Sequence, residues 1–250
     1  MDESGRLSRL RREHTSAAVQ RRLARPRRPS LLRDAVLGAV DGCVTTFAVV
    51  AGAVGGGLSD RTILILGGSN LLADGFSMAA SNYLGARSLT EEIEFARSRE
   101  VDHIRLIPEG EKEEVRQIFA AKGFHGDLLE QVVAILTSDK EVWLRTMLDE
   151  ELGLGKASPR PVLSGAATFL AFCLAGVIPL STFLFPGLAK DAAFPLSCLG
   201  AAMTFLAVGG IKGLLVGKPI LASGAATLGL GGVAAALAYV TGNALDALLR

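Results

Sequence analysis

Residues 35–57 read AVLGAVDGCVTTFAVVAGAVGGG, and residues 62–86 read TILILGGSNLLADGFSMAASNYLGA. Each run exceeds the roughly 20 apolar residues that an α-helix needs to cross a bilayer. Each run also carries a single acidic residue, Asp41 in the first and Asp74 in the second. Because only a short turn separates the two runs, they predict a pair of antiparallel membrane-spanning helices.

Three further segments are apolar over a membrane-spanning length and contain no charged residue: 162–188, 192–211 and 219–245. The chain of 250 residues is 50% hydrophobic and 20% charged, with a mean hydropathy of +0.39. This composition excludes an ordinary soluble domain and a disordered protein. All five segments are rich in Gly, Ala and Ser, which favours close helix packing in lipid. The sequence therefore predicts an all-α membrane protein with five transmembrane helices.

Basic residues are distributed unevenly between the two ends of the predicted helices. Residues 1–34 hold ten Arg and four acidic residues, and the turn at 212–218 holds two Lys. The opposite ends hold Arg61, Lys190 and Arg250. Because cytoplasmic loops carry the excess of Lys and Arg, we expect the N-terminus in the cytoplasm and, after five spans, the C-terminus outside.

Residues 1–34 contain no apolar core, so they do not form a cleaved signal peptide. Their arginines favour a disordered basic cytoplasmic tail that rests on anionic lipid. The membrane would be the plasma (inner) membrane in a bacterium and a vacuole-like membrane in a eukaryote.

An acidic segment separates the second and third predicted spans, since residues 87–160 hold eleven basic and sixteen acidic residues. Apolar residues at helical spacing, together with Pro108 and Gly123 as breaks, predict four helices at 88–106, 109–121, 127–136 and 139–152. We expect these helices to form a small cytoplasmic bundle with Trp143 in its core. The predicted organisation is a tail, two spans, a cytoplasmic domain and three spans, with bounds 1–34, 35–87, 88–158 and 159–250.

The two acids within the spans are the first candidates for function, because a charge near mid-membrane costs about 2.5–3.5 kcal/mol on insertion scales. Antiparallel geometry places Asp41 level with Met78 or Ala79. A carboxylate opposite a thioether suits a soft or borderline divalent cation. Asn70, Asp74 and Met78 share one helix face, at positions i, i+4 and i+8.

The predicted path through the membrane thus consists of Asp41, Thr45, Asn70, Asp74 and Met78. A purely structural alternative stays open, in which both acids hydrogen-bond between helices and Met78 only packs. Two pairs of glycines on the first helix are spaced four residues apart, Gly38 with Gly42 and Gly52 with Gly56. They are interpreted as positions of close helix packing alone.

The acidic segment also contains a set of potential metal ligands at helical spacings: Glu100, His103, Glu111, Glu114, Met147 and Glu151. Carboxylate, imidazole and thioether groups suit Fe²⁺, Mn²⁺ or Zn²⁺. A solvated acidic face without any metal is the alternative. A di-iron carboxylate bundle is disfavoured, because it needs two Glu-x-x-His motifs and the pattern here supplies one, Glu100-x-x-His103.

Several of these stretches together resemble the vacuolar iron transporter family. They are DAVLGAVDGCVTTFAVVAGAVGGGLSD, LLADGFSMAASNYLGARS, IPEGEKEEVRQIF, LTSDKEVWLRTMLDEELGL and GAATFLAFCLAGVIPL, within residues 33–245. The resemblance implies a homodimer that exchanges cytosolic Fe²⁺, often with Mn²⁺, for protons along a path lined by the first helix. It also implies that Asp41 and Met78 line that path, and that the cytoplasmic metal ligands are Glu100, Glu111, Glu114, Met147 and Glu151.

Three positions depart from the family pattern. His103 stands where the family has a glutamate, Leu148 where a second methionine is usual, and Asn70 where plant members have a glutamate. Replacing a carboxylate with an imidazole keeps a ligand but removes an anionic oxygen. These departures leave the choice between Fe²⁺ and Mn²⁺ open.

The sequence as a whole therefore predicts a transporter and not an enzyme, which exports Fe²⁺ and/or Mn²⁺ in exchange for protons that Asp41 or Asp74 carries. We expect no permanently bound cofactor, with Zn²⁺ possible at the cytoplasmic site. The expected partners are the lipid bilayer, a second copy of the chain, divalent metal ions and protons, without nucleic acid. Two alternatives remain, a metal-responsive membrane sensor or scaffold and a di-iron membrane ferroxidase.

Overall fold

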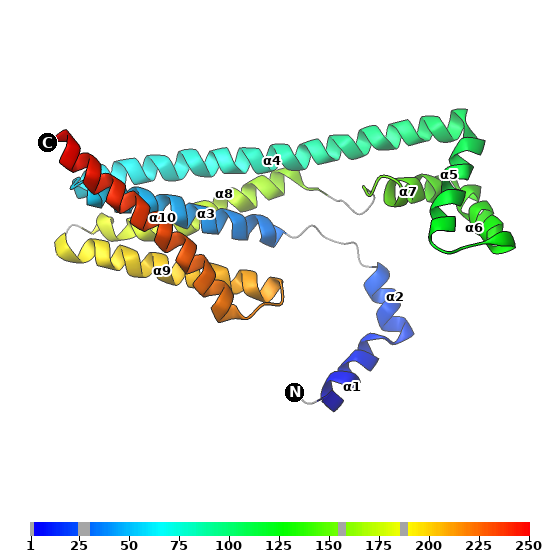
Figure 1. The fold of residues 1–250 in the computed structure, drawn as a ribbon, viewed down its shortest axis with the longest axis horizontal. Coiled ribbons are helices and arrows are strands. Elements are labelled where there is room, and N and C mark those ends of the chain that lie inside the picture. The colour runs from blue at the N-terminus through cyan, green and yellow to red at the C-terminus, as the bar shows by residue number, and fades with distance from the viewer. Residues whose placement is uncertain (1–2, 25–30, 155–158, 186–189) are drawn as a thin grey trace.

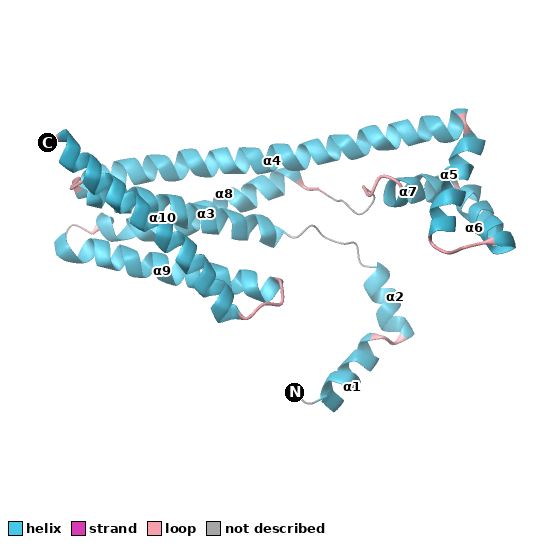
Figure 2. Ribbon diagram, viewed as in Figure 1, coloured by secondary structure: helices cyan, strands magenta, loops and turns pink. Residues whose placement is uncertain are grey.

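The computed structural model describes residues 3–24, 31–154, 159–185 and 190–250, and every regular element in these ranges is helical (Figure 2). The helices, in chain order, are α1 (Glu3–Glu13), α2 (Ser16–Ala24), α3 (Leu31–Gly55), α4 (Asp60–Leu106), α5 (Pro108–Ala121), α6 (Gly126–Ser138), α7 (Lys140–Glu150), α8 (Pro161–Ser181), a 3-10 turn (Thr182–Leu184), α9 (Lys190–Leu215) and α10 (Ile220–Leu249).

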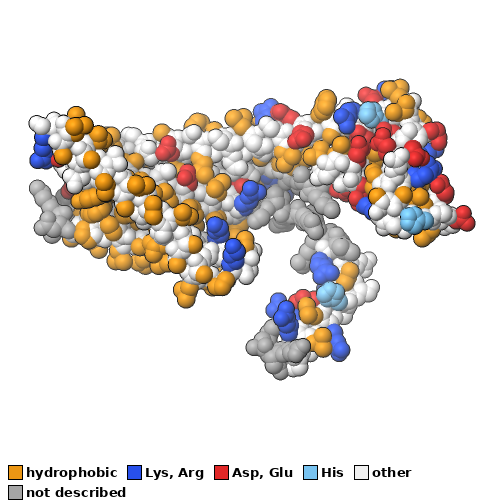
Figure 3. Space-filling model, in the orientation of Figure 1, with side chains coloured by type: hydrophobic (Ala, Val, Ile, Leu, Met, Phe, Trp, Pro, Cys, Tyr) orange, Lys and Arg blue, Asp and Glu red, His pale blue; other side chains and the backbone are white. Residues whose placement is uncertain are grey.

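Five of these helices are long and apolar enough to cross a membrane: α3, α4, α8, α9 and α10. Their outward faces carry many exposed large hydrophobic side chains, and Figure 3 shows these as a nearly continuous apolar surface over the bundle. Such a surface needs lipid around it. The prediction of an all-α integral membrane protein with five spans is therefore confirmed.

Helix α3 is the centre of the bundle, because it contacts the four other spanning helices. Glycines allow this crowding: a Cβ at Gly38 would overlap the backbone carbonyl of Thr168 on α8, and one at Gly42 would overlap that of Phe172. The interpretation of these two glycines as close-packing positions is confirmed. Backbones at this separation gain dispersion contacts that longer side chains would prevent.

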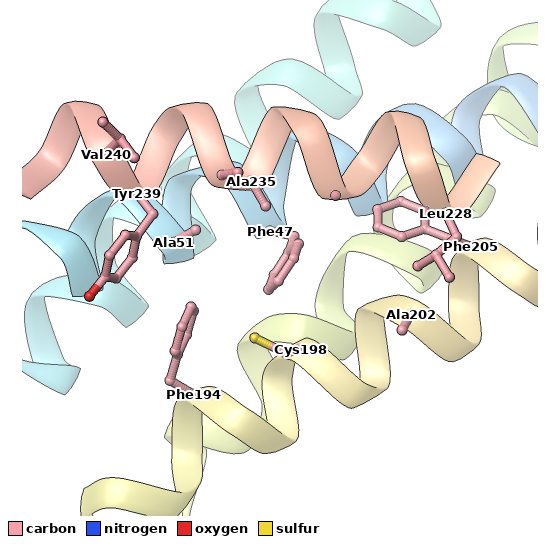
Figure 4. Close-up of a pocket in the computed structure, with 12 residues that line it drawn as sticks. Phe47, Ala51, Phe194, Cys198, Ala202, Phe205, Leu228, Ala235, Tyr239 and Val240 are labelled. Atoms are coloured by element: carbon pink, nitrogen blue, oxygen red, sulfur yellow. The ribbon is translucent and has the colours of Figure 1, made fainter. Parts of the chain in front are cut away.

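Aromatic rings fill part of the space where α3, α9 and α10 meet (Figure 4). The ring of Phe194 stacks on Phe47 at 6.4 Å and on Tyr239 at 6.0 Å between centroids. A cavity of about 440 Å³ lies beside them, lined by apolar side chains together with Cys198 and Tyr239. This lining suits an apolar occupant and not a divalent cation, so the cavity is not a candidate for the ion path.

Helix α4 is a single helix of 47 residues, about 70 Å long at 1.5 Å per residue. It runs along one side of the bundle and continues far beyond it (Figure 1). The predicted boundary between a span ending at residue 87 and a separate helix from residue 88 is therefore wrong. The helix continues because this stretch has no proline, and the Arg87–Glu91 ion pair at 2.8 Å bridges one turn across the expected break.

The extension of α4 and the helices α5, α6 and α7 form a small subdomain with its own apolar core. Trp143, only 4% exposed, lies in this core as predicted, together with Ile104, Val115 and Met147. The helices at 109–121, 127–136 and 139–152 are confirmed to within a few residues. Ion pairs cross between the helices on the outside, for example Arg97 with Glu141 at 2.9 Å. Residues 155–158 of the predicted domain lie outside the described residues.

The N-terminal segment is helical where the structure describes it, so the expectation of a disordered tail is wrong for residues 3–24. An ion pair between Arg9 and Glu13 at 2.8 Å supports α1 over one helical turn. Within the described residues, α1 and α2 contact only each other. Residues 25–30 of the predicted tail, and 186–188 of the third predicted span, lie outside the described ranges.

The two ends of the five-helix bundle differ in what they carry (Figure 1). The start of α3, the extension of α4 with its subdomain and the α9–α10 turn are at one end. The α3–α4 turn and the C-terminus are at the other end. The start of α3 and the subdomain therefore lie at the same end of the bundle, and the C-terminus lies at the opposite end.

Candidate metal site and membrane path

The candidate metal site forms where the chain turns from α4 into α5. Glu100 and His103 lie one turn apart on α4, and Pro108 ends that helix and begins α5. The reversal brings Glu111 of α5 beside them. The Nδ1 atom of His103 lies 3.2 Å from Oε1 of Glu111 and 3.9 Å from Oε1 of Glu100, and one potential ligand atom from each of the three residues lies within 4.8 Å of the other two.

Both carboxylates of this site are buried without hydrogen-bond partners. The side chains of Glu100 and Glu111 are each 1% exposed, and none of their four carboxylate oxygens accepts a hydrogen bond. Buried charges are otherwise paired or bound to metal, because leaving them unsatisfied costs several kcal/mol. His103 is 41% exposed and links the site to the solvent. The arrangement has the donor set and the access that a divalent cation requires.

The local electrostatics are strongly negative. Burial raises the pKa of Glu111 to about 7, and repulsion from Glu114 and Glu100 adds to this, whereas His103 acts in the opposite direction. Burial also raises the pKa of Glu151, followed by repulsion from Glu100 and Glu114. Five of the six predicted ligands therefore interact in one cluster. The side chains of Glu114 and Glu151 are exposed, at its rim.

The sixth predicted ligand, Met147, lies in the apolar core of the subdomain and is fully buried. The same core contains Ile104 and Val115. Each directly follows a predicted ligand in the sequence, His103 and Glu114 respectively. Leu148, where the family pattern has a second methionine, is buried in the same core. Met147 therefore packs in this core, and its role as a metal ligand stays a prediction.

Arg99 is a neighbour of the site that the sequence pattern did not reveal. Its Nη2 atom lies 3.7 Å from Oε1 of Glu100, and its side chain is 49% exposed. The residue was missed because adjacent positions on a helix do not normally face each other.

The two acids of the membrane path lie at the same depth in the bundle. Gly42 follows Asp41, Gly75 follows Asp74, and both glycines pack against Phe172 of α8. Both aspartates are half-buried and close enough for their charges to interact. The expectation that Asp41 lies level with Met78 or Ala79 is therefore wrong by about one turn. The cause is that α3 and α4 begin earlier than the predicted spans, at Leu31 and Asp60.

The other predicted path residues have separate surroundings. The hydroxyl of Thr45 donates to the backbone oxygen of Asp41 at 2.9 Å. The amide nitrogen of Asn70 is buried and has no hydrogen-bond partner. Met78 packs against the apolar cluster that contains Phe172. Asn82, one turn further, instead braces α4 against α8, donating to Oγ1 of Thr168 at 2.7 Å.

Known proteins share both the five spans and the intervening subdomain region with this chain. A family model described as the VIT family matches residues 32–243. A vacuolar iron transporter of Toxoplasma gondii is 35% identical over 224 residues, which cover 86% of this chain and 74% of that protein. Vacuolar iron transporter 1 of Arabidopsis thaliana is 34% identical over 84% of each chain, and that of Tulipa gesneriana is 32% identical over 87% and 88%.

The match extends across the membrane acids, the long α4 helix and the buried carboxylates, and it leaves out only the N-terminal helices and the last residues of α10. This integral membrane protein therefore belongs to the VIT family, the family of the vacuolar iron transporters.

Proposed function

We propose that this protein is a secondary transporter that moves Fe²⁺ and/or Mn²⁺ out of the cytosol in exchange for protons. The observation that carries the proposal is the buried pair Glu100 and Glu111, whose oxygens lack hydrogen-bond donors beside the imidazole of His103. A divalent cation would supply the positive charge that these groups lack. The names of the relatives, as iron transporters, support the choice of a transition metal as the substrate.

The proposed sequence of events begins in the subdomain. The carboxylates of the cluster, with His103, collect the ion from the cytosol, and this mixed donor set also accepts Zn²⁺. The ion then enters the membrane at the level of Asp41 and Asp74, with Asn70 and Met78 on the same helix as Asp74. Because two carboxylates at one depth repel each other, one of them takes up the returning proton once the ion has left.

The proposed orientation follows from the distribution of basic residues. The end that carries the subdomain also carries the arginine-rich segment 1–34, which supports a cytoplasmic location for that end. The resemblance supports a homodimer with α3 at its interface. Asp41 is half-buried within one copy, so a second copy would enclose the path that a single copy leaves open.

The test uses proteoliposomes that contain the purified protein and are acidic inside. Entry of Fe²⁺ and of Mn²⁺ is followed separately for the wild type, Asp41→Ala and Asp246→Ala. Asp246 is a matched control, because it is an acid on another spanning helix that pairs with Arg250 at 2.8 Å near the end of the chain. We expect entry that depends on the proton gradient in the wild type and in Asp246→Ala, and none in Asp41→Ala.

Other results would contradict the proposal. Binding of Mn²⁺ without entry would favour a metal sensor or scaffold, and oxygen consumption on addition of Fe²⁺ would favour a ferroxidase. Entry that persists in Asp41→Ala at the wild-type rate would remove Asp41 from the path.

A further inference from the structure

A permanent positive charge lies at the opening of the buried metal cluster. Arg99 on α4 approaches Oε1 of Glu100 to 3.7 Å and also acts electrostatically on Glu151. Arg99 therefore interacts with the carboxylate of Glu100 on α4 and with that of Glu151, which directly follows α7. A guanidinium stays charged at every pH at which the protein is folded. In the empty site, Arg99 is the residue whose charge always offsets that of Glu100.

The contact between Arg99 and Glu100 is loose. The oxygens of Glu100 accept no hydrogen bond, and half of the Arg99 side chain is exposed to solvent. The neighbouring pair Arg97 and Glu141 differs, because Nη2 of Arg97 donates to both carboxylate oxygens, at 2.9 and 3.1 Å. A hydrogen-bonded pair of that kind would occupy the oxygens that a metal needs. The Arg99 contact leaves them available, and its long side chain can move into the solvent without breaking a hydrogen bond.

We infer that Arg99 is a displaceable counter-ion that sets the affinity of the site for its substrate cation. It pairs with Glu100 while the site is empty and moves toward solvent when a divalent ion binds. Its charge opposes the incoming ion, so the site binds less tightly than its carboxylates alone would allow. The inference rests on the proposed function, because a collecting site must release its ion into the membrane path.

The experiment is a calorimetric titration of the full-length protein in detergent with Mn²⁺. Arg99→Gln removes the charge, and Arg97→Gln is the matched control. The control makes the same change in net charge two residues away on the same helix, at an ion pair on the outer surface. We expect Arg99→Gln to lower the Kd for Mn²⁺ about three- to thirtyfold at low salt, since removing a unit charge some 6 Å from a divalent ion in a solvated site has this effect.

Four further expected results complete the test. Arg97→Gln leaves the Kd within about twofold, because an exposed charge further from the ion is screened. Arg99→Lys stays close to the wild type, because it keeps the charge. The effect of Arg99→Gln shrinks at high salt, as expected for a half-exposed charge. In proteoliposomes, Arg99→Gln lowers the half-saturating Mn²⁺ concentration without raising the maximal rate, because release becomes slower.

Two results would overturn the inference while the proposed function stands. In the first, the wild type binds Mn²⁺, and Arg99→Gln and Arg97→Gln have equal Kd values for Mn²⁺. The other is weaker binding by Arg99→Gln, which would make Arg99 a residue that holds Glu100 in place. If Arg99→Gln does not fold, Arg99→Met, which keeps the apolar stem, gives the same comparison. Absence of binding of both Mn²⁺ and Fe²⁺ in the wild type and in the Arg99 variants would overturn the proposed function as well.

Discussion

At the scale of single residues, we expect the buried carboxylates Glu100 and Glu111 to set how stability and metal binding depend on pH. Each is enclosed by protein, and neither receives a hydrogen bond. Burial, followed by repulsion from Glu114 and Glu100, raises the pKa of Glu111 to about 7. The folded state therefore holds a proton on Glu111 more tightly than the unfolded chain does. The empty protein loses stability as the pH rises from about the ordinary carboxyl value of 4.5 through 7, because a second negative charge then forms in the site.

Metal binding should show the opposite dependence on pH. Because a ligand must be deprotonated, an ion that binds below pH 7 has to displace the proton on Glu111. We expect the Kd for Mn²⁺ to rise between pH 7.5 and pH 6, approaching about tenfold per pH unit below the pKa for one released proton. Calorimetric titration of the full-length protein at several pH values measures this slope.

The control for that measurement is Glu113→Gln. Hydrogen bonds from Gln117 and then Arg116 hold the pKa of Glu113 below its ordinary value, so its carboxylate stays ionised over this range. The variant should keep the wild-type slope, and Glu111→Gln should lose it. A Kd that does not change between pH 7.5 and pH 6 would contradict the assignment of the proton to Glu111.

At the scale of elements, the spacing between helices decides where the path residues lie. The contact of α3 with α8 depends on glycines whose missing side chains let the two backbones approach. Asp41 lies directly before one of these glycines, so the same contact fixes the position of Asp41 relative to Asp74. Helix α4 then connects this level of the membrane with the metal cluster, since Asp74 and Glu100 belong to one continuous helix.

A substitution at the α3–α8 contact should therefore affect both stability and transport. In Gly42→Ala, the added methyl group would overlap the carbonyl of Phe172. Overpacking of this kind costs about 1–3 kcal/mol. We expect a lower thermal unfolding temperature in detergent and slower Mn²⁺ entry into proteoliposomes.

Gly68→Ala is the matched control on the second spanning helix, because an added Cβ at Gly68 meets no atom within 4 Å. It should unfold at the wild-type temperature or slightly above it, since Ala favours a helix over Gly by up to about 1 kcal/mol. Equal losses of stability in the two variants would show that the close contact with α8 is not the cause.

At the scale of the whole molecule, an odd number of spans places the two chain ends on opposite sides. The N-terminal helices and the subdomain belong to the same end of the bundle, and the C-terminus belongs to the other (Figure 1). The subdomain carries the charged surface visible in Figure 3, and the bundle carries the apolar one. In the proposed function, an ion collected in the subdomain would travel along the bundle and leave at the end that carries the C-terminus.

The side on which each end lies can be tested with short epitopes in intact cells. We expect an epitope after Arg250 to be cleaved by external protease, whereas epitopes after Met1 and in the exposed turn at Gly123 are cleaved only after permeabilisation. The Gly123 turn is a suitable insertion point, because this glycine has a positive φ of 95° and open space around it. N- and C-terminal epitopes on the same side would contradict the five-span topology.

The sequence by itself determined the number of spans, the helices of the acidic segment, the two membrane acids and the family. These features depend on local composition, hydrophobic length and motif spacing, which a chain carries before it folds. It also indicated part of the candidate metal site, because Glu100 and His103 share a helix face whatever the tertiary structure. Only the tertiary structure decided that Glu111 joins them, that Asp41 and Asp74 lie at one depth, and that Arg99 faces Glu100. The positions of Glu111 and of the two aspartates arise from how separate helices pack, and the contact between Arg99 and Glu100 arises from how the two side chains orient in the folded subdomain. No local pattern encodes how closely two helices approach.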